Sequence, residues 1–195
     1  MRLNKTFPQT LALFALMLTL SAVSFAKGNS NFPSIKISNF GQMDENFYRG
    51  ARPKDKDYAA LALLGIKTII DLTDNSRSYE QPAVEAAGLR YVNVPIVDKS
   101  YPTAEQVSAF LKAVNDPATG KFYVHCAGGR HRTGIMGAVY RFNHDHWNFD
   151  QAYAEMLQYD FYTSNGHGKQ QDFIQDYWQQ FQAKANATVA PTAGR

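Results

Sequence analysis

A glycine-rich turn between a predicted strand and a predicted helix is the feature that most restricts the fold. Residues 121–125, KFYVH, are typical of a buried strand, and residues 133–144 have helical spacing. The turn between them contains two adjacent glycines and the single cysteine of the chain. Glycines allow a tight loop whose N–H groups converge on one centre, and a helix N-terminus adds its positive end there. The segment therefore predicts an anion-binding junction between a strand and a helix.

Strands and helices alternate along most of the chain. We expect strands at residues 46–50, 66–72, 89–96 and 121–125, and helices at 55–64, 82–87, 103–114, 133–144, 150–158 and 169–185. This alternation predicts an α/β domain with a central, largely parallel sheet flanked by helices on both faces. In such folds ligands lie where strand C-termini meet helix N-termini, which is the position of the glycine-rich turn.

The beginning of the chain has the pattern of a signal peptide. A short basic start precedes an apolar run at residues 11–23, and small residues at Ser24 and Ala26 suit cleavage after Ala26. The run is shorter than the roughly 20 residues that a membrane span needs. We therefore expect an exported protein, periplasmic or secreted, with no stable membrane span after cleavage.

The remaining chain reads as one domain with two weakly structured ends. We expect a lead-in at 27–45 that is mobile to about residue 37, a folded domain at 46–185 and a disordered tail at 186–195.

Charge and cysteine content exclude some function classes. The chain has 20 basic and 17 acidic residues, and removal of residues 1–26 leaves 18 and 17, so the domain is almost neutral. This balance, without a basic run, gives no support for a nucleic-acid partner, and we expect a monomer. One cysteine forms no internal disulfide, so the thiol is either a nucleophile or a buried bystander.

The residues of the turn point to chemistry on phosphate. The helix N-terminus and nearby arginines should lower the pKa of the Cys126 thiol below its ordinary value. Arg132 offers a planar fork that binds two phosphate oxygens, and the Thr133 hydroxyl can donate to the sulfur. These residues together predict a charged nucleophile at the base of a phosphate cradle.

The stretch HCAGGRHRTG, residues 125–134, resembles the HCx5R[ST] signature of the protein tyrosine phosphatase superfamily. It is most similar to the compact, atypical members of the dual-specificity branch. The segments FYRGARP, IKTIIDL and VYRFNHDHWNFDQAYAEM also resemble that group, so that the likeness covers residues 47–181.

The resemblance implies a cysteine-dependent phosphatase fold and a two-step reaction through a phosphocysteine. Cys126 would be the nucleophile, Arg132 would bind the phosphate, and Thr133 would help the thiolate leave. Residues that would supply cradle N–H groups are Ala127, Gly128, Gly129, Arg130 and His131. His125 would organise the loop. Neither step needs a metal or another cofactor.

The same family usually takes its general acid from a separate loop. Asp98 lies in PIVDKSYP, whose P-x-x-D pattern resembles the acid loop of several branches, and is our preferred candidate. Asp74 is the rival, and Asp71 is expected to be a strand-end residue.

Two substrate classes remain open, a phosphorylated protein and an inositol phosphate. Arg130 could engage a second phosphate, whereas Ala127 stands where lipid phosphatases have a basic residue. A non-catalytic phosphate-binding pseudophosphatase is a further alternative. Thiol redox chemistry fits less well, because a resolving cysteine is absent from the sequence. Sulfur transfer also fits less well, because the related family typically has a shorter loop without the R-T-G ending.

Several other polar residues receive structural interpretations. His144 and His146 are two positions apart and face different ways on a helix, so these residues and His167 do not predict a metal site. Arg49 and Arg52 are expected to be ion-pair partners, although either could line the pocket.

Overall fold

The computed structural model describes residues 32–75 and 78–189, and the predicted signal peptide lies outside them. Its strands are β1 (Gly41–Gln42), β2 (Phe47–Ala51), β3 (Thr68–Thr73), β4 (Arg90–Ile96) and β5 (Phe122–Cys126). Its α-helices are α1 (Asp55–Leu63), α2 (Glu80–Ala86), α3 (Ala104–Asn115), α4 (His131–Tyr140), α5 (Phe149–Gln158) and α6 (Gly168–Val189). A short turn of 3-10 helix, η2 (Pro117–Thr119), and one of π-helix, η3 (Arg141–Asp145), complete the order.

The five strands form one sheet in the order β1-β2-β5-β3-β4. All neighbouring pairs are parallel except β1 and β2. Strand β5 lies in the centre, where Ala51 of β2 is level with Cys126 and Asp71 of β3 is level with His125. The carboxyl ends of three adjacent strands therefore meet at one edge of the sheet, beside Cys126.

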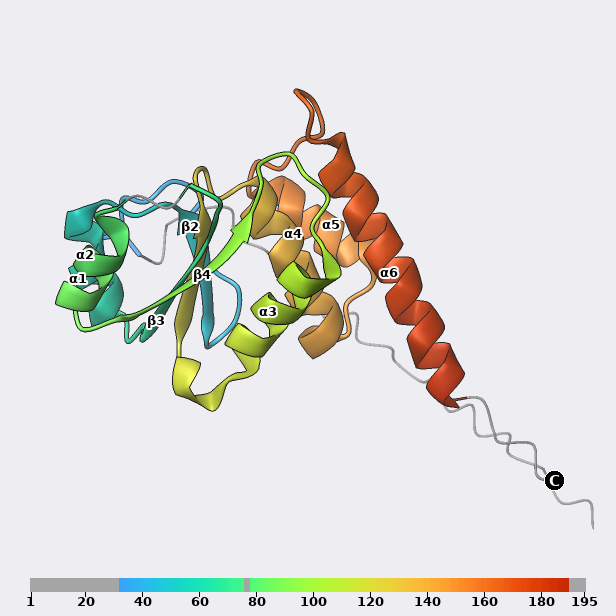
Figure 1. The fold of residues 1–195 in the computed structure, drawn as a ribbon, viewed down its shortest axis with the longest axis horizontal. Helices are drawn as coiled ribbons and strands as arrows, with labels where there is room; N and C mark the ends of the chain where they lie inside the picture. Colours follow the sequence, from blue (N-terminus) through green and yellow to red (C-terminus); the bar gives the residue numbers. More distant parts are fainter. Residues whose placement is uncertain (1–31, 76–77, 190–195) are drawn as a thin grey trace, which may run out of the picture.

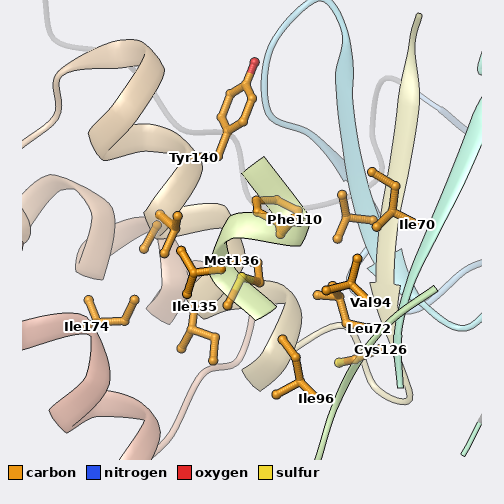
Figure 2. Close-up of a cluster of buried hydrophobic side chains, with 14 of the residues drawn as sticks. Ile70, Leu72, Val94, Ile96, Phe110, Cys126, Ile135, Met136, Tyr140 and Ile174 are labelled. Carbon is orange, nitrogen blue, oxygen red and sulfur yellow. The ribbon is translucent and has the colours of Figure 1, made fainter. Parts of the chain in front are cut away.

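Helices cover both faces of the sheet (Figure 1). Helices α1 and α2 pack on one face, and α3, α4, α5 and α6 pack on the other. Strand β5 serves both layers because its side chains alternate, with Tyr123 in one core cluster and Phe122 and Val124 in the other. Figure 2 shows the larger cluster, in which Cys126 lies near Leu72 and Ile96. The predicted α/β fold is confirmed.

The prediction that the chain is mobile up to about residue 37 is wrong for residues 32–37, which the structure describes. Ile35 and Ile37 are buried, and with Phe40 they belong to the core on the α1–α2 face. The alternation of buried and exposed side chains from Ile35 to Ile37 shows why this polar-looking segment packs, since each isoleucine points inward between polar neighbours. The segment also contributes β1, which lengthens the sheet.

Three helix boundaries differ from the sequence prediction. Helix α2 begins at Glu80, so that this carboxylate, expected in a polar loop, is fully buried. Helix α4 ends at Tyr140, and the π-helical turn η3 continues it. Helix α6 continues to Val189, four residues into the predicted tail. The start of α3 is stabilised by a capping box, in which the Thr103 side chain accepts a hydrogen bond from the Gln106 backbone N–H.

Among the helices within residues 32–75 and 78–189, none is both long enough and apolar enough to cross a bilayer.

Because residues 32–45 pack against the domain, shortening a buried side chain there should lower the stability measurably. Ile35→Ala should lower the free energy of unfolding by about 3 kcal/mol, because a fully buried isoleucine leaves a cavity. Urea denaturation of the full chain measures this change. Lys36→Ala, at the exposed neighbouring position, is the control and should change the stability by less than about 0.5 kcal/mol. Equal effects of the two substitutions would contradict the described packing.

Candidate active site

The cysteine loop, residues 126–132, joins the end of β5 to the first turn of α4. Gly129 adopts a φ of +67°, and a Cβ there would collide with the backbone of Gly50 on β2. A side chain at this position is therefore excluded by both strain and space. The second glycine of the sequence motif is what lets the loop turn tightly against its neighbouring strand.

Three consecutive carbonyl groups of the loop accept hydrogen bonds from outside it. The backbone N–H of Arg52 donates to Ala127 O at 3.3 Å, Asn39 Nδ2 to Gly128 O at 2.9 Å, and Arg49 Nη2 to Gly129 O at 2.7 Å. Because these carbonyls are fixed by the lead-in and β2, the N–H groups of the same peptides are left to face the centre of the loop. The loop is thus arranged to bind an anion.

Cys126 lies at the base of this arrangement and is buried. Burial raises the pKa of its thiol, but hydrogen bonds from the side chain and backbone of Thr133, the charge of Arg132 and the Gly129 N–H outweigh burial, so the pKa is lowered. The buried Thr133 hydroxyl makes no other hydrogen bond in the described part of the chain, so its proton can turn to the sulfur. The site therefore stabilises a thiolate.

Arg132 brings together both candidates for the general acid. Its Nη1 donates to Asp74 Oδ1 at 2.9 Å and to the carbonyl of Ile96 at 3.0 Å, and its Nη2 lies 3.7 Å from Asp98 Oδ1. The guanidinium is almost fully buried, whereas half of the Asp98 side chain is exposed. The loops after β3 and β4 are therefore anchored over the cysteine loop by one cation.

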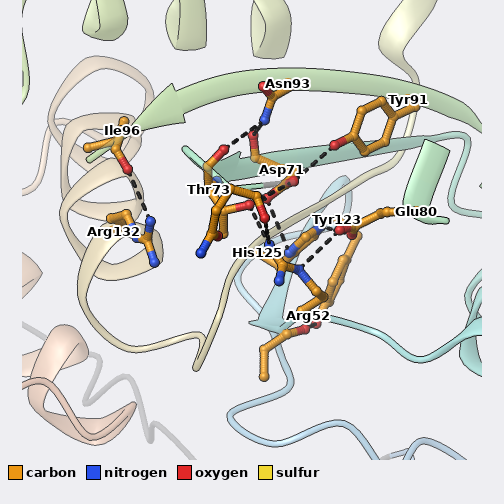
Figure 3. A network of polar contacts seen from close by, with 12 residues as sticks. Arg52, Asp71, Thr73, Glu80, Tyr91, Asn93, Ile96, Tyr123, His125 and Arg132 are labelled. Atoms are coloured by element: carbon orange, nitrogen blue, oxygen red, sulfur yellow. Dashed lines mark hydrogen bonds and ion pairs between the residues drawn. The ribbon is translucent and has the colours of Figure 1, made fainter. Parts of the chain in front are cut away.

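His125, which precedes the cysteine, lies in a buried cluster of polar and charged side chains (Figure 3). Its Nε2 is 2.9 Å from Glu80 Oε1, and its Nδ1 is 3.7 Å from Asp71 Oδ1. Glu80 also pairs with Arg52 Nε at 3.0 Å and accepts a hydrogen bond from the Tyr58 hydroxyl at 3.1 Å. This cluster confirms Arg52 as an ion-pair partner and gives His125 two carboxylate neighbours that the sequence analysis did not identify.

Asp71, Glu80 and His125 form the one group of side chains within residues 32–75 and 78–189 whose spacing could suit a metal ion. The ligand atoms of Asp71, Glu80 and His125 lie within 4.8 Å of one another. However, Arg52 and Tyr58 already occupy the oxygens of Glu80, and Thr73 donates to both oxygens of Asp71. A cation would have to displace a guanidinium, so the donor set fits an internal ion-pair network better than a metal.

His131 connects the cysteine loop to the segment after α5. Its ring stacks on that of His167, with centroids 3.4 Å apart and an interplanar angle of 6°, and its Nε2–H donates to the Tyr162 carbonyl at 3.1 Å. Burial and the neighbouring His167 lower the pKa of His131 to about 4. His167, considered only as a possible metal ligand in the sequence, thus has a packing role against the active-site loop.

The structure gathers nearly all of the predicted site residues. Cys126, Arg132 and Thr133 converge, the loop residues from Ala127 to His131 surround them, and Asp98 and Asp74 both reach Arg132. Arg130 is partly exposed, 3.8 Å from Asp160. Sequence reasoning missed Asn39 and Glu80, because the first lay in a presumed lead-in and the second in a presumed loop; the polar contacts of both depend on tertiary packing.

Comparison with known proteins agrees with this geometry. The sequence profile described as "DSP-PTPase phosphatase fused to NAD+ Kinase" matches residues 25–176. The probable chloroplastic NAD kinase 2 of Oryza sativa subsp. japonica is 30% identical over 157 residues, which are 77% of this chain and 15% of that protein. The dual specificity protein phosphatase TpbA of Pseudomonas aeruginosa strain UCBPP-PA14 is 30% identical over 125 residues, 64% of this chain and 54% of TpbA. The chain thus spans only part of these relatives.

Solved structures share the fold. The core catalytic domain of the PP-IP phosphatase SIW14 from S. cerevisiae superposes with a TM-score of 0.62 at 23% identity, over 78% of this chain and 95% of that one. At this identity the likeness concerns the fold.

The His131–His167 stack predicts a pH-dependent stability. The unfolded chain protonates His131 below about pH 6.5, whereas the folded chain does so only near pH 4. Stability is therefore present above pH 6.5 and is lost as the pH falls from 6.5 toward 4, by about 2 kcal/mol at pH 5. Urea denaturation at pH 7 and pH 5 measures the loss. His131→Gln should reduce it, and His144→Gln, at an exposed position, should leave it unchanged; identical pH dependence in all three proteins would refute the assignment.

Proposed function

The chain belongs to the family of DSP-PTPase phosphatase domains, in the dual-specificity branch of the protein tyrosine phosphatase superfamily, and from that premise we propose that it hydrolyses phosphomonoesters through a phosphocysteine at Cys126. The observation that carries the proposal is that three features meet in one loop. They are a buried thiol whose pKa is lowered, the Arg132 guanidinium, and backbone carbonyls that are hydrogen-bonded to residues outside the loop. Such a loop binds a tetrahedral dianion and places a nucleophile below it.

In the first step the Cys126 thiolate attacks phosphorus, an S–P bond forms and the P–O bond to the leaving group breaks. The loop N–H groups and Arg132 balance the charge on the phosphoryl oxygens. For this Arg132 must turn from Asp74, which accepts one of its hydrogen bonds at 2.9 Å, toward the substrate. Substrate binding thus exchanges an internal carboxylate for a phosphate.

In the second step water attacks phosphorus and the S–P bond breaks. The Thr133 hydroxyl, which faces the sulfur, stabilises the thiolate as it leaves. We assign the general acid of the first step, and the base of the second, to Asp98, because it lies beside Arg132 without a direct hydrogen bond to it and is half exposed. A carboxyl group in that position can reach the leaving oxygen above the loop.

The surroundings of the site favour one phosphate on an apolar or aromatic carrier. Two other arginines near the cysteine loop, Arg52 and Arg130, already have acidic partners, Glu80 and Asp160. Val97 and Tyr162, by contrast, present exposed apolar surface on the two loops beside Asp98 and His131. We therefore propose a phosphotyrosine-type substrate in a protein or peptide.

An inositol polyphosphate is the second candidate. The S. cerevisiae protein SIW14 is named a PP-IP phosphatase, and an Arabidopsis thaliana protein that is 27% identical to this chain over 104 residues is named inositol diphosphatase DSP3. Export to the periplasm or the medium remains a further proposal, supported by the apolar run at residues 11–23.

Phosphate release by the full chain tests the reaction. With reductant and a chelator present, we expect release from a phosphotyrosine peptide to exceed release from a phosphoserine peptide, a phosphoinositide and inositol hexakisphosphate. Cys126→Ser should lower the rate by at least about a thousandfold, since it removes the nucleophile. Preference for inositol hexakisphosphate would select the second candidate. Phosphate binding without release from any compound would instead identify a pseudophosphatase.

Matched amide substitutions test the general acid. Asp98→Asn should lower kcat by about a hundredfold or more for phosphoserine, whose alkoxide leaves poorly, and by less for phosphotyrosine, because a phenol has a pKa of about 10. Asp74→Asn should act mainly on KM, since it removes the negative charge that pairs with Arg132. Steady-state kinetics on both substrates separates the two, and the reverse pattern would move the role to Asp74.

A further inference from the structure

Arg49 is a fully buried cation in the middle of β2, with 1% of its surface exposed. No carboxylate lies within ion-pair distance of it in the parts of the chain that the structure describes, in contrast to the ion-pair role expected from the sequence. The other arginine buried in the core nearby, Arg141, is bonded to Glu155 and Asp145. A buried cation without a carboxylate in direct contact is costly, and an anion bound at the cysteine loop would offset part of that cost.

The contacts of Arg49 lead to the cysteine loop. Nη2 donates to the Gly129 carbonyl at 2.7 Å, and the guanidinium lies 4.0 Å from the centre of the Tyr159 ring. The buried Nε has no hydrogen-bond partner. The Gly129 carbonyl belongs to the peptide whose N–H is that of Arg130, so the bond from Arg49 turns this N–H toward the centre of the loop.

We infer that Arg49 is a positioning residue for the phosphatase reaction, which fixes the Gly129–Arg130 peptide and supplies from beneath the loop a positive charge that the Cys126 thiolate and the bound phosphoryl group balance. This inference rests on the proposed function. It assigns to β2 a second cation of the site, which acts through the loop and does not touch the substrate.

Other charged and polar groups also surround the thiol. Arg132 faces Cys126 from α4, and Tyr123 lies on its own strand β5. Behind His125, the carboxylates of Asp71 and Glu80 are balanced in part by Arg52. Burial lowers the pKa of Arg49, and the charges of Tyr159, Glu155 and Cys126 act in the opposite direction.

Substitutions that keep the length of the side chain test the inference in the full chain. Arg49→Met removes the charge and the hydrogen bond, and Arg49→Lys keeps the charge. We expect Arg49→Met to bind tungstate about tenfold more weakly and to react with iodoacetate about fivefold more slowly at pH 6, with partial recovery of both in Arg49→Lys. Its melting temperature should be unchanged or higher, because an unpaired buried charge is gone.

Arg141→Met is the matched control. It also removes a buried arginine that stacks on an aromatic ring, that of Trp147, but it leaves Glu155 without its partner. We expect a lower melting temperature with unchanged tungstate affinity and alkylation rate for the folded protein. Unchanged tungstate binding and alkylation in Arg49→Met would overturn the inference, and so would equal losses in the two methionine variants.

Neither readout depends on turnover, so the two proposals fail separately. If the parent chain binds tungstate but hydrolyses no phosphomonoester, the proposed function fails while the comparison of Arg49→Met with Arg49→Lys still tests the role of Arg49. If the parent chain turns over substrate and Arg49→Met does so with the same kcat, KM and tungstate affinity, only the role of Arg49 fails.

Discussion

The fixed outward direction of three loop carbonyls is the constraint on which the site depends. A chain of consecutive N–H groups converges on an anion only if the paired C=O groups have partners elsewhere. Here those partners come from Asn39, Arg49 and the backbone of Arg52, all of which precede the loop by more than 70 residues. The parallel pairing of β2 with β5 is what brings them there, so the anion site depends on the topology of the sheet as much as on the loop sequence.

Buried charges around the loop fall into two groups with different consequences. Glu80, Arg52 and His125 lie in mutual contact, so much of their desolvation cost is offset within the cluster, and they fix the end of β5. Arg132 and Arg49 lie closer to the place where the cysteine loop would bind an anion. Arg132 is covered by Asp74, a partner that a phosphate can replace. The first group is paired within the fold, whereas on the proposed function the second would be completed by the ligand.

The local sequence was sufficient to predict the fold class, most elements and the residues that converge in the cysteine loop. The glycines and Cys126, Arg132 and Thr133 lie within eight residues, so their geometry follows from one turn between a strand and a helix. Glu80 and Asn39 could not be found this way, because a carboxylate at a helix start and an amide in a polar segment look solvent-exposed until distant elements cover them. Ile35 was missed for a related reason: two isolated isoleucines among polar residues form too short a pattern to predict a packed segment.

Two buried arginines, Arg49 and Arg141, show that burial alone does not tell how the charge of a side chain is balanced. Arg141 has carboxylate partners, a carbonyl partner and an aromatic ring, and its charges are balanced within the fold. Arg49 has a carbonyl partner and an aromatic ring but no carboxylate among the described residues. Glu155 acts on Arg49 only from beyond ion-pair distance, and the Cys126 thiolate is a further negative charge that stabilises this cation. On the proposed role of Arg49, the thiolate and a bound phosphate would add the negative charge that no carboxylate supplies in direct contact with this guanidinium.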